Sequence, residues 1–177
     1  QIKLKVFKEE QRFTQKWILL LLAISGLIPV LIIFISYLKQ KNQQDLSNIF
    51  VTISITMLVS AVIFLFKLST RIDQEGIHYQ FFPFHFKFRR IAWDELEKAY
   101  VRKYDAITEF GGWGLKGGFF WKKSKGVAIN VSGDIGIQLV LKNGKKILIG
   151  TNQEEQAKQV LHNYASKIKT ENHENSI

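Results

Sequence analysis

Two long stretches without a charged side chain lie near the N-terminus, at residues 17–38 and 49–66. A helix needs about 20 apolar residues to cross a hydrocarbon core about 30 Å thick. Neither stretch shows the polar stripe of a helix that borders a soluble core, and little else in the chain could cover both. We therefore predict two transmembrane helices, residues 17–38 and 49–68, joined by a short external loop at residues 39–48.

Lysine and arginine are distributed unevenly around these stretches. Residues 1–16 contain five of them, whereas the loop at 39–48 contains two. Because positive charge near span ends favours the cytoplasm, we expect a basic cytoplasmic N-terminus and, after two crossings, a cytoplasmic C-terminal domain. The first stretch is too long for the apolar part of a signal peptide and no cleavage pattern follows it, so we do not expect one.

The second stretch carries small hydroxyl residues at helical spacing, Thr52, Thr56 and Ser60. Such a stripe lets two membrane helices approach closely, so we predict that it packs against a neighbouring helix. Neither stretch holds an ionisable side chain, which pumps and ion pathways usually need. The sequence therefore argues against a transporter.

From residue 71 onward the pattern changes to the alternation that is typical of β-strands. Phe84, Phe86 and Phe88 alternate with polar and basic residues, which predicts a strand there, and Asn143-Gly144 is a strong hairpin signal. A capping box beginning at Thr151 predicts a helix to residue 168, followed by a disordered tail at 169–177. The fold class is thus an α+β membrane protein with about seven strands and one C-terminal helix. Trp93 is expected in its core.

Several short motifs stand out in this part of the chain: Gly76-Ile77, Phe82-Pro83-Phe84-His85, Ile91-x-Trp93-x-Glu95-Leu96, Gly111-Gly-Trp-Gly-Leu115 and residues 143–151. Together with the order of elements, they resemble bacterial membrane proteins with a pleckstrin-homology-like (PH-like) domain. The resemblance covers most of residues 71–168, and its helical hairpin layout covers 17–68. It implies an antiparallel β-barrel or sandwich, capped by a helix, at the cytoplasmic face of a bacterial inner membrane.

The resemblance also bears on the ligand. PH domains that bind phosphoinositides use a basic cluster in the first strand loop, and residues 74–76 here, Gln-Glu-Gly, are not basic. We therefore do not expect a phosphoinositide.

Residues suited to catalysis or metal binding are few. The chain has no cysteine, and His78 and His85 lack a third ligand at metal-binding spacing. The carboxylates at 94–97 fit the exposed face of a strand start better than acid–base chemistry. We therefore predict no catalytic residue, metal or cofactor.

One segment suits the boundary between lipid headgroups and water, because aromatic residues are followed by lysines. Its members are Phe119, Phe120, Trp121, Lys122, Lys123 and Lys125. Two interpretations remain open. Either the segment contacts the membrane surface, or the aromatic side chains fill the β domain and the lysines are solvated.

Two functions fit these patterns. The first is a non-enzymatic, membrane-anchored binding or scaffold module whose partner is a protein, a peptide or lipid headgroups. The second is an accessory subunit of a larger inner-membrane complex. The net charge of +10 also suits nucleic acid, but the charges alternate along strands and form no dense stripe, so a nucleic-acid partner is not expected.

Overall fold

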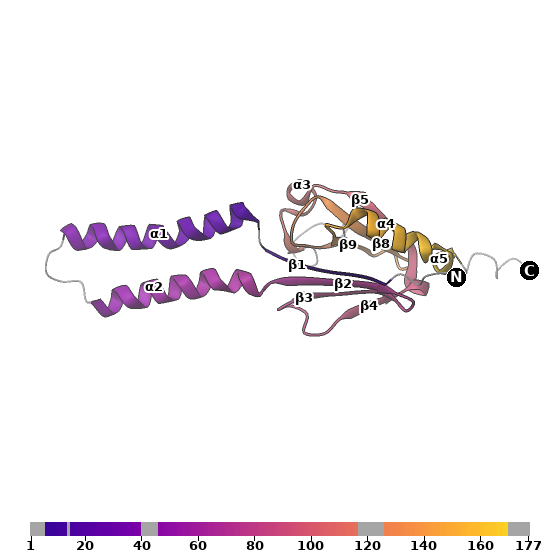
Figure 1. The fold of residues 1–177 in the computed structure, drawn as a ribbon, viewed down its shortest axis with the longest axis horizontal. Helices are drawn as coiled ribbons and strands as arrows, with labels where there is room; N and C mark the ends of the chain where they lie inside the picture. The colour runs from indigo at the N-terminus through magenta and orange to yellow at the C-terminus, as the bar shows by residue number, and fades with distance from the viewer. Residues whose placement is uncertain (1–5, 14, 40–45, 117–125, 170–177) are drawn as a thin grey trace, which may run out of the picture. The chain divides into compact units, whose positions relative to one another are not determined.

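The computed structural model describes residues 6–13, 15–39, 46–116 and 126–169, and the chain divides into two compact units (Figure 1). The apolar unit is Phe13–Phe66. The β unit combines the N-terminal segment Gln1–Arg12 with Lys67–Ile177. The apolar unit is therefore an insertion in the sequence of the β unit.

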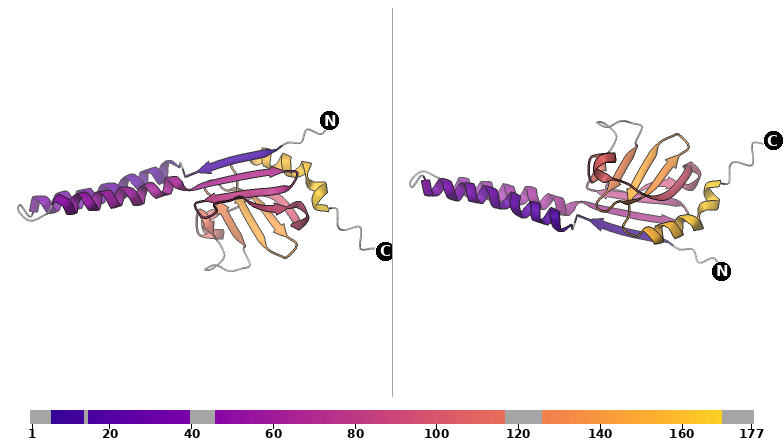
Figure 2. Two further views of the ribbon diagram at one scale, coloured as in Figure 1. Left: turned by 90° about the horizontal axis from the view of Figure 1, so that it is seen from below. Right: turned by 90° about the horizontal axis from the view of Figure 1, so that it is seen from above.

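The apolar unit consists of helices α1 (Lys16–Lys39) and α2 (Leu46–Ala61), followed by the short 3-10 helix η1 (Val62–Leu65). Helices α1 and α2 lie side by side (Figure 2). Within α1, Ile18–Ser36 is long and apolar enough to cross a membrane, and only 6% of its most apolar window is buried. The apolar part of the second helix, Phe50–Leu65, is shorter. It ends before the predicted residue 68 because the next strand begins at Lys67.

The first sheet of the β unit has the strand order β1-β2-β3-β4, and every pairing is antiparallel. Its strands are β1 (Phe7–Arg12), β2 (Lys67–Asp73), β3 (Gly76–Phe82) and β4 (Arg89–Ala92). Strand β1 lies within the segment that we expected to be a basic cytoplasmic N-terminus. In the pairing of β1 with β2, Arg12 lies opposite Lys67, so the two ends of the apolar insertion meet on neighbouring strands.

The second sheet has the strand order β5-β8-β9-β7-β6. Its strands are β5 (Leu96–Lys103), β6 (Gly114–Lys116), β7 (Val127–Asn130), β8 (Ile135–Leu141) and β9 (Lys146–Gly150). They run across the strands of the first sheet (Figure 2). The described residues thus form nine strands in two sheets that do not close into a barrel, whereas we predicted about seven antiparallel strands. Strand β9 lies between β8 and β7 and pairs with β7 in parallel.

Helix α4 (Glu154–Asn163) links the two sheets, because it contacts β1 in the first and β5 and β8 in the second. It buries Ala157, Val160 and Leu161, and the short helix α5 (Ala165–Lys169) follows it. The chain passes from the first sheet to the second through the 3-10 helix η2 (Trp93–Glu95). The predicted burial of Trp93 is confirmed. Its ring stacks on Tyr164 at 5.0 Å, and its indole N–H donates to the Asp73 carbonyl at 2.9 Å.

Strand β1 is fixed by polar contacts to a segment far away in sequence. Its inward face buries Phe7, Glu9 and Gln11. The Glu9 carboxylate accepts hydrogen bonds from the Thr151 hydroxyl at 2.6 Å and the Asn152 N–H at 2.8 Å.

The predicted capping box is only partly correct. The Thr151 hydroxyl oxygen does accept from a backbone amide, the Gln153 N–H, at 3.1 Å. However, the Thr151 N–H donates to the Ile135 carbonyl rather than to Glu154, and α4 begins after Gln153 without a side-chain cap.

Candidate functional site

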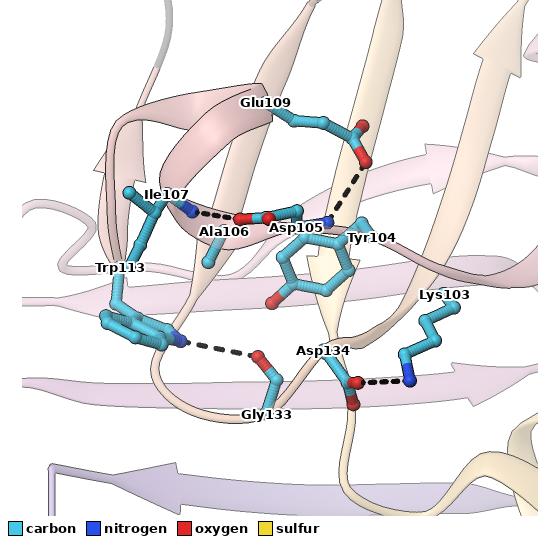
Figure 3. Close-up of a pocket in the computed structure, with 9 residues that line it drawn as sticks. All are labelled: Lys103, Tyr104, Asp105, Ala106, Ile107, Glu109, Trp113, Gly133 and Asp134. Atoms are coloured by element: carbon cyan, nitrogen blue, oxygen red, sulfur yellow. Dashed lines mark hydrogen bonds and ion pairs between the residues drawn. The ribbon is translucent and has the colours of Figure 1, made fainter.

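A hollow of about 440 Å³ lies beside the short helix α3 (Ala106–Phe110) in the β unit (Figure 3). Its lining residues are Lys103, Tyr104, Asp105, Ala106, Ile107, Glu109, Trp113, Gly133 and Asp134. Helix α3 is firmly capped at both ends. The Asp105 carboxylate accepts from the Ile107 and Thr108 N–H groups at 2.8 and 2.9 Å, and Gly111 ends the helix with a φ of 73°.

The charged groups around the hollow all have partners within the β unit. Lys103 Nζ lies 2.9 Å from Asp134 Oδ2, and this hydrogen bond raises the pKa of Lys103. Hydrogen bonds from Thr108 and then from Ile107 lower the pKa of Asp105. The indole N–H of Trp113 donates to the Gly133 carbonyl at 3.3 Å. A ligand in the hollow would therefore meet a polar rim with one lysine and three carboxylates, of which Asp105 is bonded to backbone N–H groups rather than to a cation.

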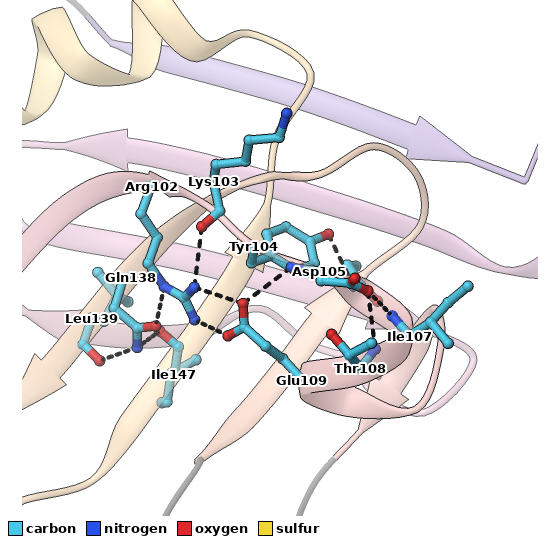
Figure 4. A network of polar contacts seen from close by, with 11 residues as sticks. Arg102, Lys103, Tyr104, Asp105, Ile107, Thr108, Glu109, Gln138, Leu139 and Ile147 are labelled. Carbon is cyan, nitrogen blue, oxygen red and sulfur yellow. Dashed lines mark hydrogen bonds and ion pairs between the residues drawn. The ribbon is translucent and has the colours of Figure 1, made fainter.

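A polar network behind the hollow holds α3 against the second sheet (Figure 4). Two nitrogens of the Arg102 guanidinium bind both carboxylate oxygens of Glu109, at 2.7 and 3.1 Å. The Arg102 Nε donates to Gln138 Oε1 at 3.1 Å, and the buried Gln138 amide donates in turn to the carbonyls of Leu139 and Ile147. Such two-point Arg–carboxylate pairs fix geometry as well as charge. The network thus has a positioning role for α3.

Tyr104 has a side-chain hydroxyl that could be considered as a catalytic base in this hollow. Its ring is buried, and the hydroxyl accepts a hydrogen bond from the Asn130 amide at 2.9 Å. Burial raises the pKa of Tyr104 to about 12, although the bond from Asn130 opposes that shift. The hydroxyl therefore stays protonated at neutral pH, which suits a hydrogen-bonding role rather than that of a base.

A second feature of the β unit is the loop between β3 and β4, residues 83–88, which we call the aromatic loop. The sequence predicted a strand here, and that prediction is wrong, because the strand resumes only at Arg89. Phe84, Phe86 and Phe88 are 58%, 79% and 51% exposed. The alternation of phenylalanines thus marks an exposed loop and not the apolar face of a sheet.

His85 fixes the aromatic loop from its inner side. Its backbone N–H donates to the Phe81 carbonyl at 2.8 Å, and its ring Nδ1 accepts from the Phe81 N–H at 3.3 Å. The side chain is buried, and this burial, followed by the charge of Arg89, lowers the pKa of His85. These conditions favour the neutral imidazole ring, and only in the neutral ring can Nδ1 accept a hydrogen bond.

The residues predicted to contact the membrane surface, Phe119, Phe120, Trp121, Lys122, Lys123 and Lys125, lie outside the described residues. Thr56 and Ser60 line a groove of about 540 Å³ between α1 and α2, together with Gly26 and Pro29. Thr52 is exposed, and its carbonyl accepts from the Thr56 hydroxyl at 2.9 Å. The packing of this stripe on another helix stays a prediction.

The two histidines considered as metal ligands lie in separate surroundings. His78 Nε2 is 3.2 Å from Asp73 Oδ1, whereas His85 belongs to the aromatic loop. The part of the chain that the structure describes holds no group of three histidine, cysteine or acidic side chains placed to bind a metal. Glu95, the last residue of η2, accepts from the Ala92 N–H at 3.3 Å. Glu97 Oε1, in β5, lies 3.8 Å from Lys98 Nζ.

Sequence reasoning missed two features that the structure brings forward. One is the buried carboxylate of Glu9 on β1, whose partners are more than 140 residues away, so no local pattern could reveal it. The other is the exposure of the aromatic loop. Pro83 was a usable signal, since proline cannot donate to a strand ladder and commonly marks a turn.

Comparison with known proteins finds no protein family, curated protein or solved structure that matches the chain.

Proposed function

We propose that this chain is a non-enzymatic, membrane-anchored binding or scaffold module, with a PH-like β unit at the cytoplasmic face of a bacterial inner membrane. One observation carries the proposal. Arg12 at the end of β1 lies opposite Lys67 at the start of β2, and everything between them is the apolar unit. The β unit is therefore joined to a potential membrane anchor by two neighbouring strands.

This pairing restricts how the anchor can cross a bilayer. Paired residues of antiparallel strands lie only about 5 Å apart, so the chain returns to the point where it left. A single crossing would separate these ends by about 30 Å of hydrocarbon. If α1 crosses, the segment must cross back, and α2 with η1 is the part that does so.

The shorter second helix is compatible with that role. At about 1.5 Å per residue in the α-helix and 2.0 Å in the 3-10 turn, Phe50–Leu65 spans about 26 Å. The shortfall against a core of about 30 Å is small, and local thinning of the bilayer absorbs such a mismatch at modest cost. The greater number of lysines and arginines in residues 1–16 than in 39–48 favours a cytoplasmic β unit.

The proposed PH-like character has support in the β unit. Two stacked sheets are followed by one C-terminal helix, α4, which buries an apolar face against both sheets. The parallel pairing of β7 with β9 and the added strand β1 depart from the expected plan. The turn at residues 74–76 is not basic, so we do not propose a phosphoinositide as ligand.

A binding role is supported by the hollow beside α3, which has a polar rim and a buried tyrosine that is held protonated. The test is a photoreactive amino acid at Ile107, which is 63% exposed on that rim, in the full chain in native membranes. A matched control is the same group at Lys98 on β5. We expect a discrete crosslinked protein from position 107 and not from 98. Equal, diffuse products from both positions would contradict a partner at the hollow.

The groove between α1 and α2 favours a second candidate, an accessory subunit of a membrane complex. Its lining is almost entirely apolar, and Met57, one of the lining residues, is 69% exposed. Small residues in such a groove allow another membrane helix to pack closely. A photoreactive group at position 57 that captures one integral membrane protein, which then co-purifies in mild detergent, would favour this candidate. Crosslinks to lipid alone would contradict it.

A further inference from the structure

The aromatic loop concentrates exposed apolar surface in one short segment. Three phenylalanines within five residues are each more than half exposed. In the described part of the β unit, the other exposed large apolar residues, Val6, Tyr100 and Ile107, stand singly. Scattered exposed apolar side chains are ordinary, whereas a cluster of aromatic rings marks a contact surface.

The loop is held in place by bonds that do not involve the exposed rings. The buried His85 bonds twice to Phe81, and the Gln80 side chain donates to the Phe86 carbonyl at 3.0 Å. Phe86 also packs edge to face on Phe82, with ring centroids 6.0 Å apart. The rings are thus presented outward by a fixed backbone, which lowers the entropic cost of docking them.

The position of the aromatic loop at one end of the first sheet indicates which surface the loop faces. Phe82, the last residue before the loop, pairs with Lys67, and Lys67 pairs with Arg12. The loop therefore starts at the end of the sheet where both connections to the apolar unit leave. If that unit crosses the bilayer, this end of the sheet lies within one or two residues of the membrane surface.

The charges of the loop fit an anionic surface. Lys87 lies between Phe86 and Phe88, and Arg89 and Arg90 follow. Arg90 is 3.5 Å from Glu75, whereas no carboxylate of the described residues lies within ion-pair distance of Lys87 or Arg89. Aromatic rings next to cations are the combination that binds at the boundary between acyl chains and anionic headgroups.

We propose that the aromatic loop docks on the anionic leaflet in which the chain's own apolar unit is anchored. Phe86 and Phe88 enter the headgroup region, and Lys87 and Arg89 bind phospholipid phosphates. The inference rests on the proposed membrane anchor. Its effect is to hold the β unit in one orientation on the membrane, so that the hollow beside α3 faces its partner in a fixed way.

The test uses the full chain, which contains no cysteine, so one can be introduced without competing thiols. Phe86→Cys carries a spin label, and Ile107→Cys, exposed and apolar but outside the loop, is the matched control. Each protein is reconstituted in vesicles of phosphatidylcholine with and without phosphatidylglycerol. Collision of the label with oxygen, which dissolves in lipid, is compared with collision with a water-soluble nickel chelate.

We expect the label at position 86 to favour oxygen in vesicles that contain phosphatidylglycerol, while the label at 107 favours the nickel chelate. Lys87→Gln with Arg89→Gln should reduce the docked-to-free ratio by about 30-fold, since each cation near an anionic surface contributes roughly fivefold. A label at 86 that favours the nickel chelate would overturn the proposal. Protection from both reagents would also overturn it and would indicate a protein contact instead.

Flotation of the same vesicles separates this inference from the function on which it rests. A chain that floats and resists alkaline extraction, but whose loop label stays in water, would overturn the docking alone. A chain that does not float with the vesicles would overturn the membrane anchor itself.

Discussion

The carboxylate of Glu9 forms the contacts that fix the N-terminal strand β1 to the rest of the β unit. It is 6% exposed, and it accepts hydrogen bonds from the Thr151 hydroxyl, itself 1% exposed, and from the Asn152 N–H. Replacing Glu9 with alanine removes both bonds and leaves the buried Thr151 O–H without the acceptor to which it donates. We predict a large loss of stability from this one change at the edge of the first sheet.

The magnitude follows from the two lost bonds. A hydrogen bond to a charged group contributes about 1.5–3 kcal/mol, and an unsatisfied buried donor costs a similar amount. We therefore expect Glu9→Ala to reduce the free energy of unfolding by about 3 kcal/mol. For a unit of this size the midpoint of thermal unfolding should fall by roughly 10 °C or more.

The assay is thermal unfolding of the full chain in mild detergent, and the transition is monitored by tryptophan fluorescence. Glu10→Ala is the control, because Glu10 lies next to Glu9 on the opposite, exposed face of β1 and bonds to Lys67 at 3.2 Å. An exposed ion pair of this kind contributes less than about 1 kcal/mol. If both variants unfold at the same temperature, β1 is not fixed by the Glu9 contacts and our account of the fold is refuted.

Three further predictions concern the β unit, each measured by unfolding of the full chain. Trp93→Ala should cost about 3–5 kcal/mol because the ring packs on Tyr164, whereas Trp93→Phe should cost less; equal losses would contradict the stacking. Burial and the charge of Arg89 lower the pKa of His85, so the unfolded chain binds its proton first, and stability should fall as pH drops below about 6.5. His85→Gln should flatten that slope, and an unchanged slope would exclude His85 as its source. Thr70→Val should raise stability by about 1 kcal/mol, because it removes a buried hydroxyl with no hydrogen-bond partner among the described residues; a loss would reveal a partner.

Features that depend on neighbouring residues could be predicted from the sequence. Two uncharged stretches indicated the apolar helices, because composition alone decides whether a segment can lie in hydrocarbon. Asn143-Gly144 marked the turn between β8 and β9, and Gly144 has the positive φ of 79° that the turn requires. The burial of Trp93 was also predicted, although Trp93 lies in η2 and not at the start of a strand.

Features that depend on distant residues could not be predicted. Strand β1 buries Glu9 and Gln11, so its inward face looks polar in sequence and resembles a basic tail. The bond from the Thr151 hydroxyl to Glu9 could not be predicted either, since nothing local shows that a carboxylate 142 residues away is its acceptor. At residues 83–88, alternation of phenylalanines predicted a strand, but the backbone turns because His85 bonds back to Phe81.

The resemblance to PH-like membrane proteins predicted a membrane anchor joined to a β domain. Membership of that family stays a proposal. The resemblance could not foresee that the apolar unit is inserted between two paired strands. That insertion came from the register of Arg12 with Lys67, which only a structure reveals. It adds a geometric argument for two crossings, whereas the side on which the β unit lies still depends on the count of charges.

The most direct test of that requirement is the sidedness of three single cysteines in an otherwise cysteine-free chain. Glu10→Cys lies on β1 and Lys145→Cys in the turn between β8 and β9, while Lys41→Cys lies between the two helices, outside the described residues. We predict that a membrane-impermeant thiol reagent labels position 41 in intact cells, and positions 10 and 145 only in inverted membrane vesicles. The reverse pattern would keep two crossings and overturn the orientation. Labelling of 10 and 145 on opposite sides, or of 41 on the same side as both, would contradict the double crossing.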